Sequence, residues 1–235
     1  MLRRSLVAFA FVSGVAFADP IPKESETAKI KRVWGELVDA GGDAKIKLEG
    51  EKLKMTVPSG DRLVYLMRGG TPTFAPYIYQ KIGGDFVAMV TVHRHVALAG
   101  TTGFAADPLT GSGLLAIFDN KTILSFCRAT KQNDEGSQFR STFRYPAGSS
   151  VTTGGGPAKQ GMIGTAKLKL TRSGDLLRME YSLDDGKKWQ QFSKYQRATN
   201  DEVKIGIYAE HSCDAVTEAV FEGFSVKALV DEKKP

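Results

Sequence analysis

This sequence of 235 residues contains no long amphipathic helical pattern, no unit repeated at a fixed period and no concentrated run of basic residues. Without a helical period, its many short alternating runs favour an all-β protein. The missing repeat argues against a β-propeller. The missing basic run argues against a nucleic-acid partner, although the formal net charge is +6.

Long apolar runs are also scarce. The one at residues 6–15 has about half of the ~20 residues that a transmembrane helix needs. Arg3 and Arg4 precede this run and Ala-Phe-Ala follows it at residues 16–18, which completes the pattern of a signal peptide over residues 1–18. We predict cleavage after residue 18 and export to the medium, periplasm or cell envelope. The mature chain would lose two positive charges, which leaves +4, and would have no transmembrane segment.

The rest of the chain has a simple predicted organisation. Residues 19–32 are polar, contain two prolines and lack periodicity, so we predict a flexible leader. Residues 33–228 form one predicted β-sandwich domain, and a charged tail follows at 229–235. The predicted strands are residues 44–49, 52–57, 63–67, 77–81, 85–95, 113–118, 122–129, 139–145, 166–172, 176–183, 189–195, 203–210 and 219–228. The two long irregular segments are residues 96–112 and 147–164.

A series of short motifs carries a resemblance to a known family. The motifs are, in order, APYIYQK (75–81), GDF (84–86), GLL (113–115), the strand around Phe126, YSLDDG with its following tryptophan (181–189), GIYA (206–209) and FEGFSV (221–226). The sequence resembles a bacterial domain family of unknown function, sometimes labelled enolase-regulation-protein-like, in the concanavalin A-like lectin and glucanase superfamily. It is also similar to the C-terminal domains of bacterial β-xylosidases. The resemblance implies a jelly-roll sandwich of two antiparallel sheets, one of them concave, and it implies no reaction.

The turn at residues 182–189 matches Ser-x-Asp-x-Gly-x-x-Trp, often called an Asp-box, which occurs in secreted β-proteins that handle carbohydrate. Asp184 and Asp185 could accept backbone N–H bonds across the turn, and Gly186 supplies the positive φ of the reversal. We expect Trp189 to pack as an apolar plug beneath the hairpin. Because the pattern occurs once, we interpret Asp184, Gly186 and Trp189 as structural residues.

A carboxylate pair suited to glycoside hydrolysis is missing. Jelly-roll glucanases place two acids on one strand face, where they flank the scissile bond. Here Glu180 and Asp184 are four residues apart and the second lies in the turn, while Glu49 and Glu51 straddle Gly50. We therefore expect a noncatalytic protein, with a divergent secreted glycoside hydrolase as the alternative.

Strand alternation suggests where a ligand could bind. Arg140 and Arg144 share one strand face, and Arg178 and Glu180 share another. On a concave sheet these residues would form a charged groove for sugar hydroxyls or uronic carboxylates; on a solvated face they would bind nothing. The candidate ligand-binding residues are Tyr77, Tyr79, Arg128, Arg140, Arg144, Arg178, Glu180 and Tyr208. The two tyrosines at 77 and 79 would form a stacking platform. We expect a glycan or polysaccharide as the partner, with a cell-envelope protein as the alternative.

Metal and disulfide chemistry is left open. Cys127 and Cys213 lie in separate apolar strands, and an exported protein could join them or bury them as free thiols. His93 and His95 share a strand face, as in zinc sites on strands, but a third ligand is not evident. Calcium is possible, since oxygen ligands occur near predicted loops at Asp107, Asp119, Asn120, Asp134 and Glu135, although their spacing matches no dedicated calcium loop.

Overall fold

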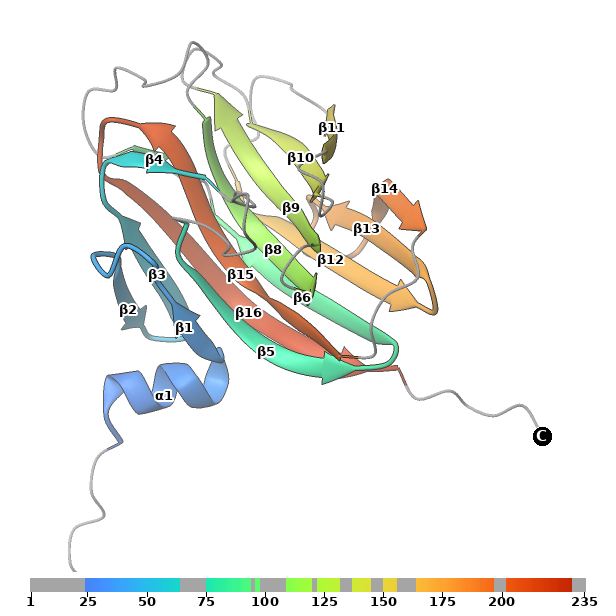
Figure 1. Cartoon of the computed structure of the whole chain (residues 1–235), viewed down its shortest axis with the longest axis horizontal. Helices are drawn as coiled ribbons and strands as arrows, with labels where there is room; N and C mark the ends of the chain where they lie inside the picture. The colour runs from blue at the N-terminus through green and yellow to red at the C-terminus, as the bar shows by residue number, and fades with distance from the viewer. Residues whose placement is uncertain are drawn as a thin grey trace, which may run out of the picture.

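The computed structural model describes residues 24–63, 75–93, 96–97, 109–119, 122–131, 137–144, 150–155, 164–196 and 202–229. These residues form one short helix and two antiparallel β-sheets that pack face to face (Figure 1). The predicted all-β, concanavalin A-like sandwich is confirmed. The predicted signal peptide lies outside the described residues, as does the charged tail beyond Leu229. No helix in the described part of the chain is long and apolar enough to cross a bilayer.

The first sheet, sheet A, has β15 at its centre, between β5 and β8. A short strand, β4 (Gly60–Arg62), pairs with the end of β15. The order across the sheet is β1 (Glu36–Val38), β5 (Tyr77–Gly83), β15 (Glu202–Cys213), β8 (Leu109–Asp119), β9 (Thr122–Lys131), β10 (Ser137–Arg144) and β11 (Ser150–Gly155).

The second sheet, sheet B, has β6 and β16 at its centre. The two-residue strand β7 (Val96–Ala97) pairs with β16. The order across the sheet is β14 (Gln190–Gln196), β13 (Leu176–Ser182), β12 (Ala166–Ser173), β6 (Phe86–Val92), β16 (Thr217–Ala228), β3 (Lys52–Val57) and β2 (Lys45–Glu49).

The core lies between the two sheets, where alternate residues of each strand point inward. In sheet B, β6 and β12 bury every second side chain. In sheet A, Phe126 and Phe139 point toward sheet B, and Phe139 stacks on Tyr181 with ring centroids 4.0 Å apart. Each fully buried phenylalanine contributes about 2–3 kcal/mol by removal of apolar surface from water. The alternation therefore fixes which side chains are left on the outer face of each sheet.

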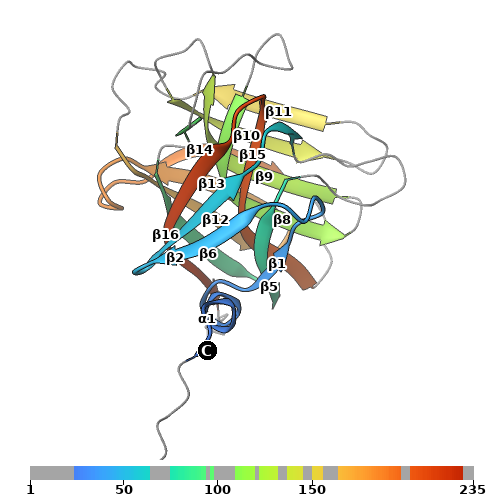
Figure 2. The same ribbon diagram turned by 90° about the vertical axis from the view of Figure 1, so that its left-hand side faces the viewer.

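Helix α1 (Glu26–Val33) corrects the prediction of a flexible leader over residues 19–32. The Ser25 side chain caps it by accepting a hydrogen bond from the Ala28 amide at 3.2 Å. The helix lies at one end of the sandwich, where Figure 2 shows it end-on. Ile30 and Trp34 enter the core, and Trp34 stacks on Phe224 at 6.2 Å. The helix was missed because its eight residues carry one buried apolar side chain.

Strand β11 corrects the prediction of an irregular segment over residues 147–164. It pairs with β10 at six consecutive positions and forms the last strand of sheet A. Its sequence, Ser-Val-Thr-Thr-Gly-Gly, ends in glycines that have low strand propensity, which is why the sequence indicated a loop. Pairing with β10 outweighs that weak local preference. The predicted strand at residues 63–67 lies outside the described residues after residue 63.

Candidate functional site

The outer face of sheet A carries a second buried cluster, separate from the main core. We call it the outer cluster, and its members come mainly from β5, β8, β9 and β15. Apolar side chains form most of it, and its polar atoms are a thiol and three hydroxyls. The outer cluster consists of Ala75, Tyr77, Tyr79, Leu115, Ile117, Ile123, Cys127, Ala129 and Tyr208.

A buried polar network lies within the outer cluster. The Tyr208 hydroxyl lies 3.5 Å from Glu210 Oε1 and also contacts Cys127 and Ser125. Burial, reinforced by the Glu210 charge, raises the pKa of the Cys127 thiol to about 12. Burial also raises the pKa of Tyr208 well above its usual range. Both groups are therefore protonated near neutral pH, and Cys127 lacks the thiolate of a reactive cysteine.

The predicted tyrosine platform is not present. Tyr77 and Tyr79 are only 5% and 9% exposed, and their rings lie against each other with centroids 6.0 Å apart. The Tyr79 hydroxyl donates a hydrogen bond to Glu36 Oε2 at 3.0 Å, and Lys204 Nζ lies 5.0 Å from the centroid of the Tyr79 ring. Tyr208, which alternation predicted at the site, is completely buried. None of these rings offers a face on which a sugar could stack, because the outer cluster uses them as packing residues.

The accessible polar part of this face lies at the edge formed by β10 and β11. We call it the β10–β11 strip, made of Gln138, Arg140, Arg144, Thr152 and Gly154; Thr142, which lies between the arginines on the same strand face, is buried. Arg140 and Arg144 point to the outer face, since Phe139 and Phe143 between them point to the core. Both arginines are half-buried. Thr142 and Thr152 face each other with their hydroxyl oxygens 3.3 Å apart. The structure thus keeps the predicted pair of arginines on one strand face.

Arg140 is the distinctive residue of the β10–β11 strip. Its register partners are Cys127 on β9 and Gly154 on β11, so a buried thiol lies on one side and no side chain on the other. A methyl group placed on Gly154 would meet no atom within 4 Å, which shows open space beside the arginine. Arg140 makes no hydrogen bond or ion pair with any other described residue. A half-buried guanidinium with free donors is suited to binding an external acceptor.

The other predicted site residues lie elsewhere, so the single charged groove proposed from alternation is wrong. Arg128 points to the opposite face of sheet A, is 2% exposed and donates a hydrogen bond to the Gly164 carbonyl. Arg178 and Glu180 are on β13, in sheet B. Alternation shows which residues of one strand share a face, but it does not show which strands share a sheet.

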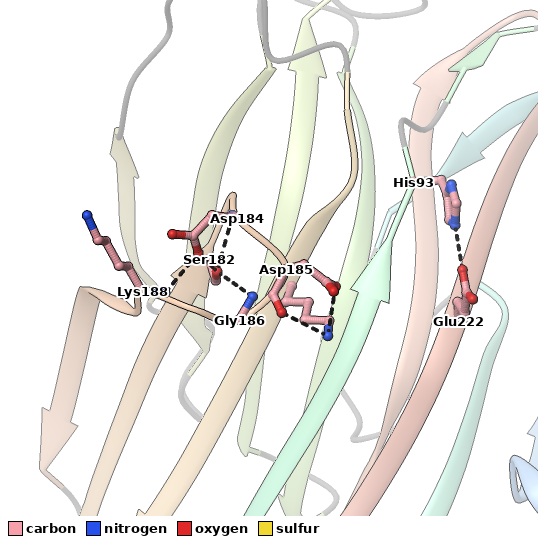
Figure 3. A network of polar contacts seen from close by, with 8 residues as sticks. His93, Ser182, Asp184, Asp185, Gly186, Lys188 and Glu222 are labelled. Atoms are coloured by element: carbon pink, nitrogen blue, oxygen red, sulfur yellow. Dashed lines mark hydrogen bonds and ion pairs between the residues drawn. The ribbon is translucent and has the colours of Figure 1, made fainter.

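The outer face of sheet B is charged and largely paired within the chain. Glu180 forms an ion pair with Lys169 at 2.9 Å, and Glu218 forms one with Lys54 at 2.7 Å. Glu222 lies 3.3 Å from His93 Nε2, as Figure 3 shows, and 3.6 Å from Lys52. This alternation of lysine and glutamate is the arrangement of a solvated sheet face. Arg178 is exposed among these pairs.

The turn at residues 182–189 joins β13 to β14 and is held by two side chains (Figure 3). Asp184 Oδ1 accepts hydrogen bonds from the Lys188 amide and the Ser182 hydroxyl, both at 2.8 Å. These bonds lower the pKa of Asp184, the Lys188 amide first. Ser182 Oγ in turn accepts from the Gly186 amide at 2.8 Å. The positive φ of Gly186, 88°, is confirmed, and Asp185 shares it with a φ of 61°.

Two expectations about this turn are wrong. Asp185 accepts no backbone N–H; its carboxylate instead forms an ion pair with Lys167 at 2.9 Å. Trp189 is half-buried and lies on the outer face of sheet B, with Lys169 Nζ 4.2 Å from its ring centroid. A cation over the indole face is a favourable contact that does not require a core position. Trp189 therefore supports a lysine beside the turn and does not fill the core.

Cys127 and Cys213 are free, buried thiols, so no disulfide joins them. They lie on β9 and β15, which β8 separates, and two cysteines on non-neighbouring strands are too far apart to bridge. Cys213 Sγ lies 3.2 Å from His211 Nδ1, and His211 Nε2 donates to the Pro58 carbonyl at 2.7 Å.

The described residues contain no group of three or more His, Cys, Asp or Glu side chains that could hold a metal ion. Of the two histidines proposed for zinc, His93 contacts Glu222 and His95 lies outside the described residues. Most of the proposed calcium ligands, namely Asp107, Asn120, Asp134 and Glu135, also lie outside them, as does the side chain of Asp119.

No protein-family model and no curated protein matches this sequence. Solved structures do share its fold. A functionally unknown protein from Saccharomyces cerevisiae superposes with a TM-score of 0.63 at 16% identity, over 83% of this chain and 96% of that one. The GH43 BlXynB protein from Bacillus licheniformis gives 0.55 at 15% identity, over 82% of this chain and 36% of that one. The exoplasmic/lumenal domain of VIP36, solved with Ca²⁺ and Man3GlcNAc, superposes with a TM-score of 0.49 at 14% identity, over 82% of this chain and 85% of that one.

These similarities concern the fold, because every identity is below 20%. This chain spans about a third of the length of the GH43 protein, so it corresponds to one part of that larger molecule. The narrower family suggested by the sequence motifs stays a prediction. The two antiparallel sheets of the described residues have the fold of a concanavalin A-like β-sandwich.

Proposed function

We propose that this chain is an exported, noncatalytic carbohydrate-binding β-sandwich, and that its glycan lies along the β10–β11 strip. The observation that carries the proposal is Arg140, a half-buried arginine that has no partner among the described residues and lies beside open space. The similarity in fold to part of a GH43 protein agrees with a carbohydrate-related role. The signal-peptide pattern at residues 1–18 supports export.

The chemistry of the β10–β11 strip suits a sugar. A guanidinium presents five N–H donors in a fixed plane, while hydroxyl and amide groups both donate and accept. Gln138 and Thr152 supply such groups near Arg140, and they come from two paired strands that hold them in fixed register. A glycan offers many hydroxyl oxygens at short intervals, so it can engage several of these groups at once.

The noncatalytic part of the proposal rests on the carboxylates. Glu180, the acid that the sequence placed nearest to a catalytic role, is bound to Lys169 on the outer face of sheet B. Glu210 is buried in sheet A beside the Tyr208 hydroxyl. The two lie on different sheets, so they do not flank one substrate-binding surface as a hydrolytic pair must.

A glycan array followed by polysaccharide pull-down tests the proposal. The full chain is expressed in a bacterial host and recovered from the exported fraction, where N-terminal sequencing should find Asp19 first. We expect retention on at least one glycan class and loss of that retention in Arg140→Gln. The matched control Arg178→Gln, which removes an exposed arginine from sheet B, should be retained like the unchanged protein. Failure to bind any glycan would contradict the function. Release of reducing sugar would contradict its noncatalytic part.

A further inference from the structure

Arg140 has closed sides and an open side on the outer face of sheet A. Thr142, the next outward residue along β10, is 4% exposed, and Cys127, the register partner on β9, is 1% exposed. On β11 the partner is Gly154, which is exposed and has open space around its Cβ position. Strand β11 is the last strand of sheet A in the described part of the chain. A ligand therefore reaches Arg140 from the β11 edge, and buried residues bound it in two other directions.

The accessible polar groups around Arg140 cover a small area. Gln138 is half-buried and lies two residues away on the same face of β10. Its Cα is therefore about 7 Å from that of Arg140. Thr152 is exposed and lies on β11, two residues from Gly154 and opposite Thr142. The area is large enough for one sugar unit, and a second unit placed further along β10 would meet the buried Thr142.

The electrostatics of this area favour one negative charge. Arg140 forms no ion pair or hydrogen bond with another described residue, and its guanidinium carries five N–H donors. The neighbouring Cys127 thiol adds no charge, because burial raises its pKa to about 12. The acid Glu210 is on β15, three strands away from β10. The buried residues beside Arg140 also exclude water, which strengthens the attraction between its guanidinium and an incoming anion.

From these observations we propose that Arg140 binds the carboxylate of a single uronic acid unit at the end of a glycan, with the rest of the glycan extending over β11. The inference rests on the proposed function and names the ligand class and the part of the ligand that is recognised. The planar guanidinium binds the carboxylate through two parallel hydrogen bonds. The Gln138 amide and the Thr152 hydroxyl bind hydroxyl groups of the same sugar unit. Gly154 leaves room for its ring.

Calorimetric titration with uronic acids and their short oligomers tests the inference. Of galacturonic, glucuronic and mannuronic acid, we expect at least one to bind as a monosaccharide. Its methyl ester, which lacks the charge, should bind at least about tenfold more weakly. The dimer and trimer of the same acid should match the monosaccharide in affinity to within about threefold, because one end unit makes the contacts. At equal mass the long polymer should compete poorly, since it has few ends.

Variants of the strip separate the roles of charge, geometry and space. Arg140→Gln should weaken binding of the acid by about 10- to 100-fold, as expected when a hydrogen bond to a charged group is lost. Arg140→Lys should lose less, because the ammonium keeps the charge and lacks the planar fork. Gly154→Leu should also weaken binding, since its side chain would occupy the open space beside Arg140. The matched control Arg178→Gln should bind like the unchanged protein.

Each other outcome overturns the inference in a recognisable way. An affinity that rises steadily with oligomer length would reject recognition of an end unit. Binding of none of the three acids, equal binding of acid and ester, or full binding by Arg140→Gln would reject a carboxylate site yet leave a neutral-glycan function standing. Equally tight binding of acetate would reject recognition of a sugar. Absence of binding to any glycan would reject the proposed function itself. Circular dichroism melting of each variant separates loss of binding from loss of folding.

Discussion

The two outer faces of this sandwich differ in whether their charged side chains are paired within the chain. On sheet B, lysines and glutamates alternate and pair with each other, as in Lys54–Glu218 and Lys169–Glu180. On sheet A, the centre of the face is a buried cluster around Tyr208, and the accessible edge carries Arg140 without a partner among the described residues. The difference teaches that number of charges alone does not identify a binding face. What distinguishes the β10–β11 strip is that Arg140 has no ion-pair partner among the described residues.

The contrast has an energetic basis. An exposed ion pair adds at most about 1 kcal/mol, because water screens both partners. Its residues are therefore free to vary with little effect on folding. A buried network such as that of Tyr208, Glu210 and Cys127 has a larger effect, because a polar group left without its partner keeps its full desolvation cost. Sheet A should thus be sensitive to small changes that sheet B tolerates.

The largest effect is expected from Gly206→Ala in the centre of sheet A. A Cβ at this position would overlap the Ile78 carbonyl oxygen on the neighbouring strand β5, and the Ile78 carbonyl carbon and Tyr79 Cα would lie 2.8 Å from it. We expect a loss of more than about 4 kcal/mol in the free energy of unfolding, or about 8–16 °C in Tm. Urea and thermal unfolding measure it. Gly154→Ala is the matched control, since its Cβ meets nothing within 4 Å, and equal destabilisation by both would contradict the assignment.

The second effect is a loss of stability at alkaline pH that originates in the outer cluster. The pKa of Cys127 rises from an ordinary value of 9.0 to about 12 on folding. The unfolded chain therefore releases this proton near pH 9 while the native state retains it. The stabilising contribution is complete below about pH 9 and is lost as the pH rises through about 12, for a total of about 4 kcal/mol. Tyr208, whose pKa is also raised, acts in the same direction.

Urea unfolding at a series of pH values from about 8 to 11 measures this slope. Cys127→Ala removes one titrating group and should flatten it, even though the smaller side chain lowers stability at neutral pH. An identical slope in the variant would show that the thiol is not the group responsible.

A smaller effect is expected at the turn that ends β13 in sheet B. Ser182→Ala removes the acceptor of the Gly186 amide and the donor to Asp184. We expect about 2 kcal/mol of destabilisation, the combined net contribution of the two hydrogen bonds that are lost. Leu183→Ala in the same turn is the control, because this side chain is exposed and should cost little. Thermal melting decides between them, and a larger loss in Leu183→Ala would reject the hydrogen-bonded turn as the stabilising feature.

The smallest effect tests the paired face directly. Glu180→Gln removes the charge that pairs with Lys169, but the neutral amide can still accept a hydrogen bond from the lysine, so the free energy of unfolding should change by about 1 kcal/mol. Glycan retention should be unchanged, since the residue is on the opposite sheet from the β10–β11 strip. Loss of retention in this variant, with a normal melting temperature, would move the binding surface to sheet B and reverse the comparison.

Much of the fold can be predicted from the alternation of apolar and polar residues. Runs such as Ala166 to Ser173 bury every second side chain in the structure, as their pattern predicts. Strand β11 and helix α1 were missed because neither has a strong local signal: one is rich in glycine and threonine, and the other has eight residues. Strand β11 is held by pairing with the preceding strand β10, and helix α1 by the packing of Ile30 into the core, and neither contact is visible in the local pattern.

The candidate site shows a different limit. Arg140 and Arg144 were correctly placed on one face of one strand, because that depends only on the two-residue period. The prediction that Arg128 and Arg178 join them in one groove is wrong. It would require knowing which face of the sheet each side chain occupies and which strands share a sheet. Tyr77 and Tyr79 were proposed as a platform because aromatic rings suit both sugars and cores. Their burial within the outer cluster depends on packing against residues that are distant in the sequence.

The position of β15 and β16 has a consequence for how the chain folds. These last two described strands occupy the interior of both sheets: β15 lies between β5 and β8, and β16 lies between β6 and β3. Until residues 202–228 are in place, each sheet exists only as two separate halves with open edges. Most pairings that close the sandwich join residues far apart in sequence, and such topologies fold slowly. Closure is therefore a late, cooperative event that depends on the C-terminal pair of strands.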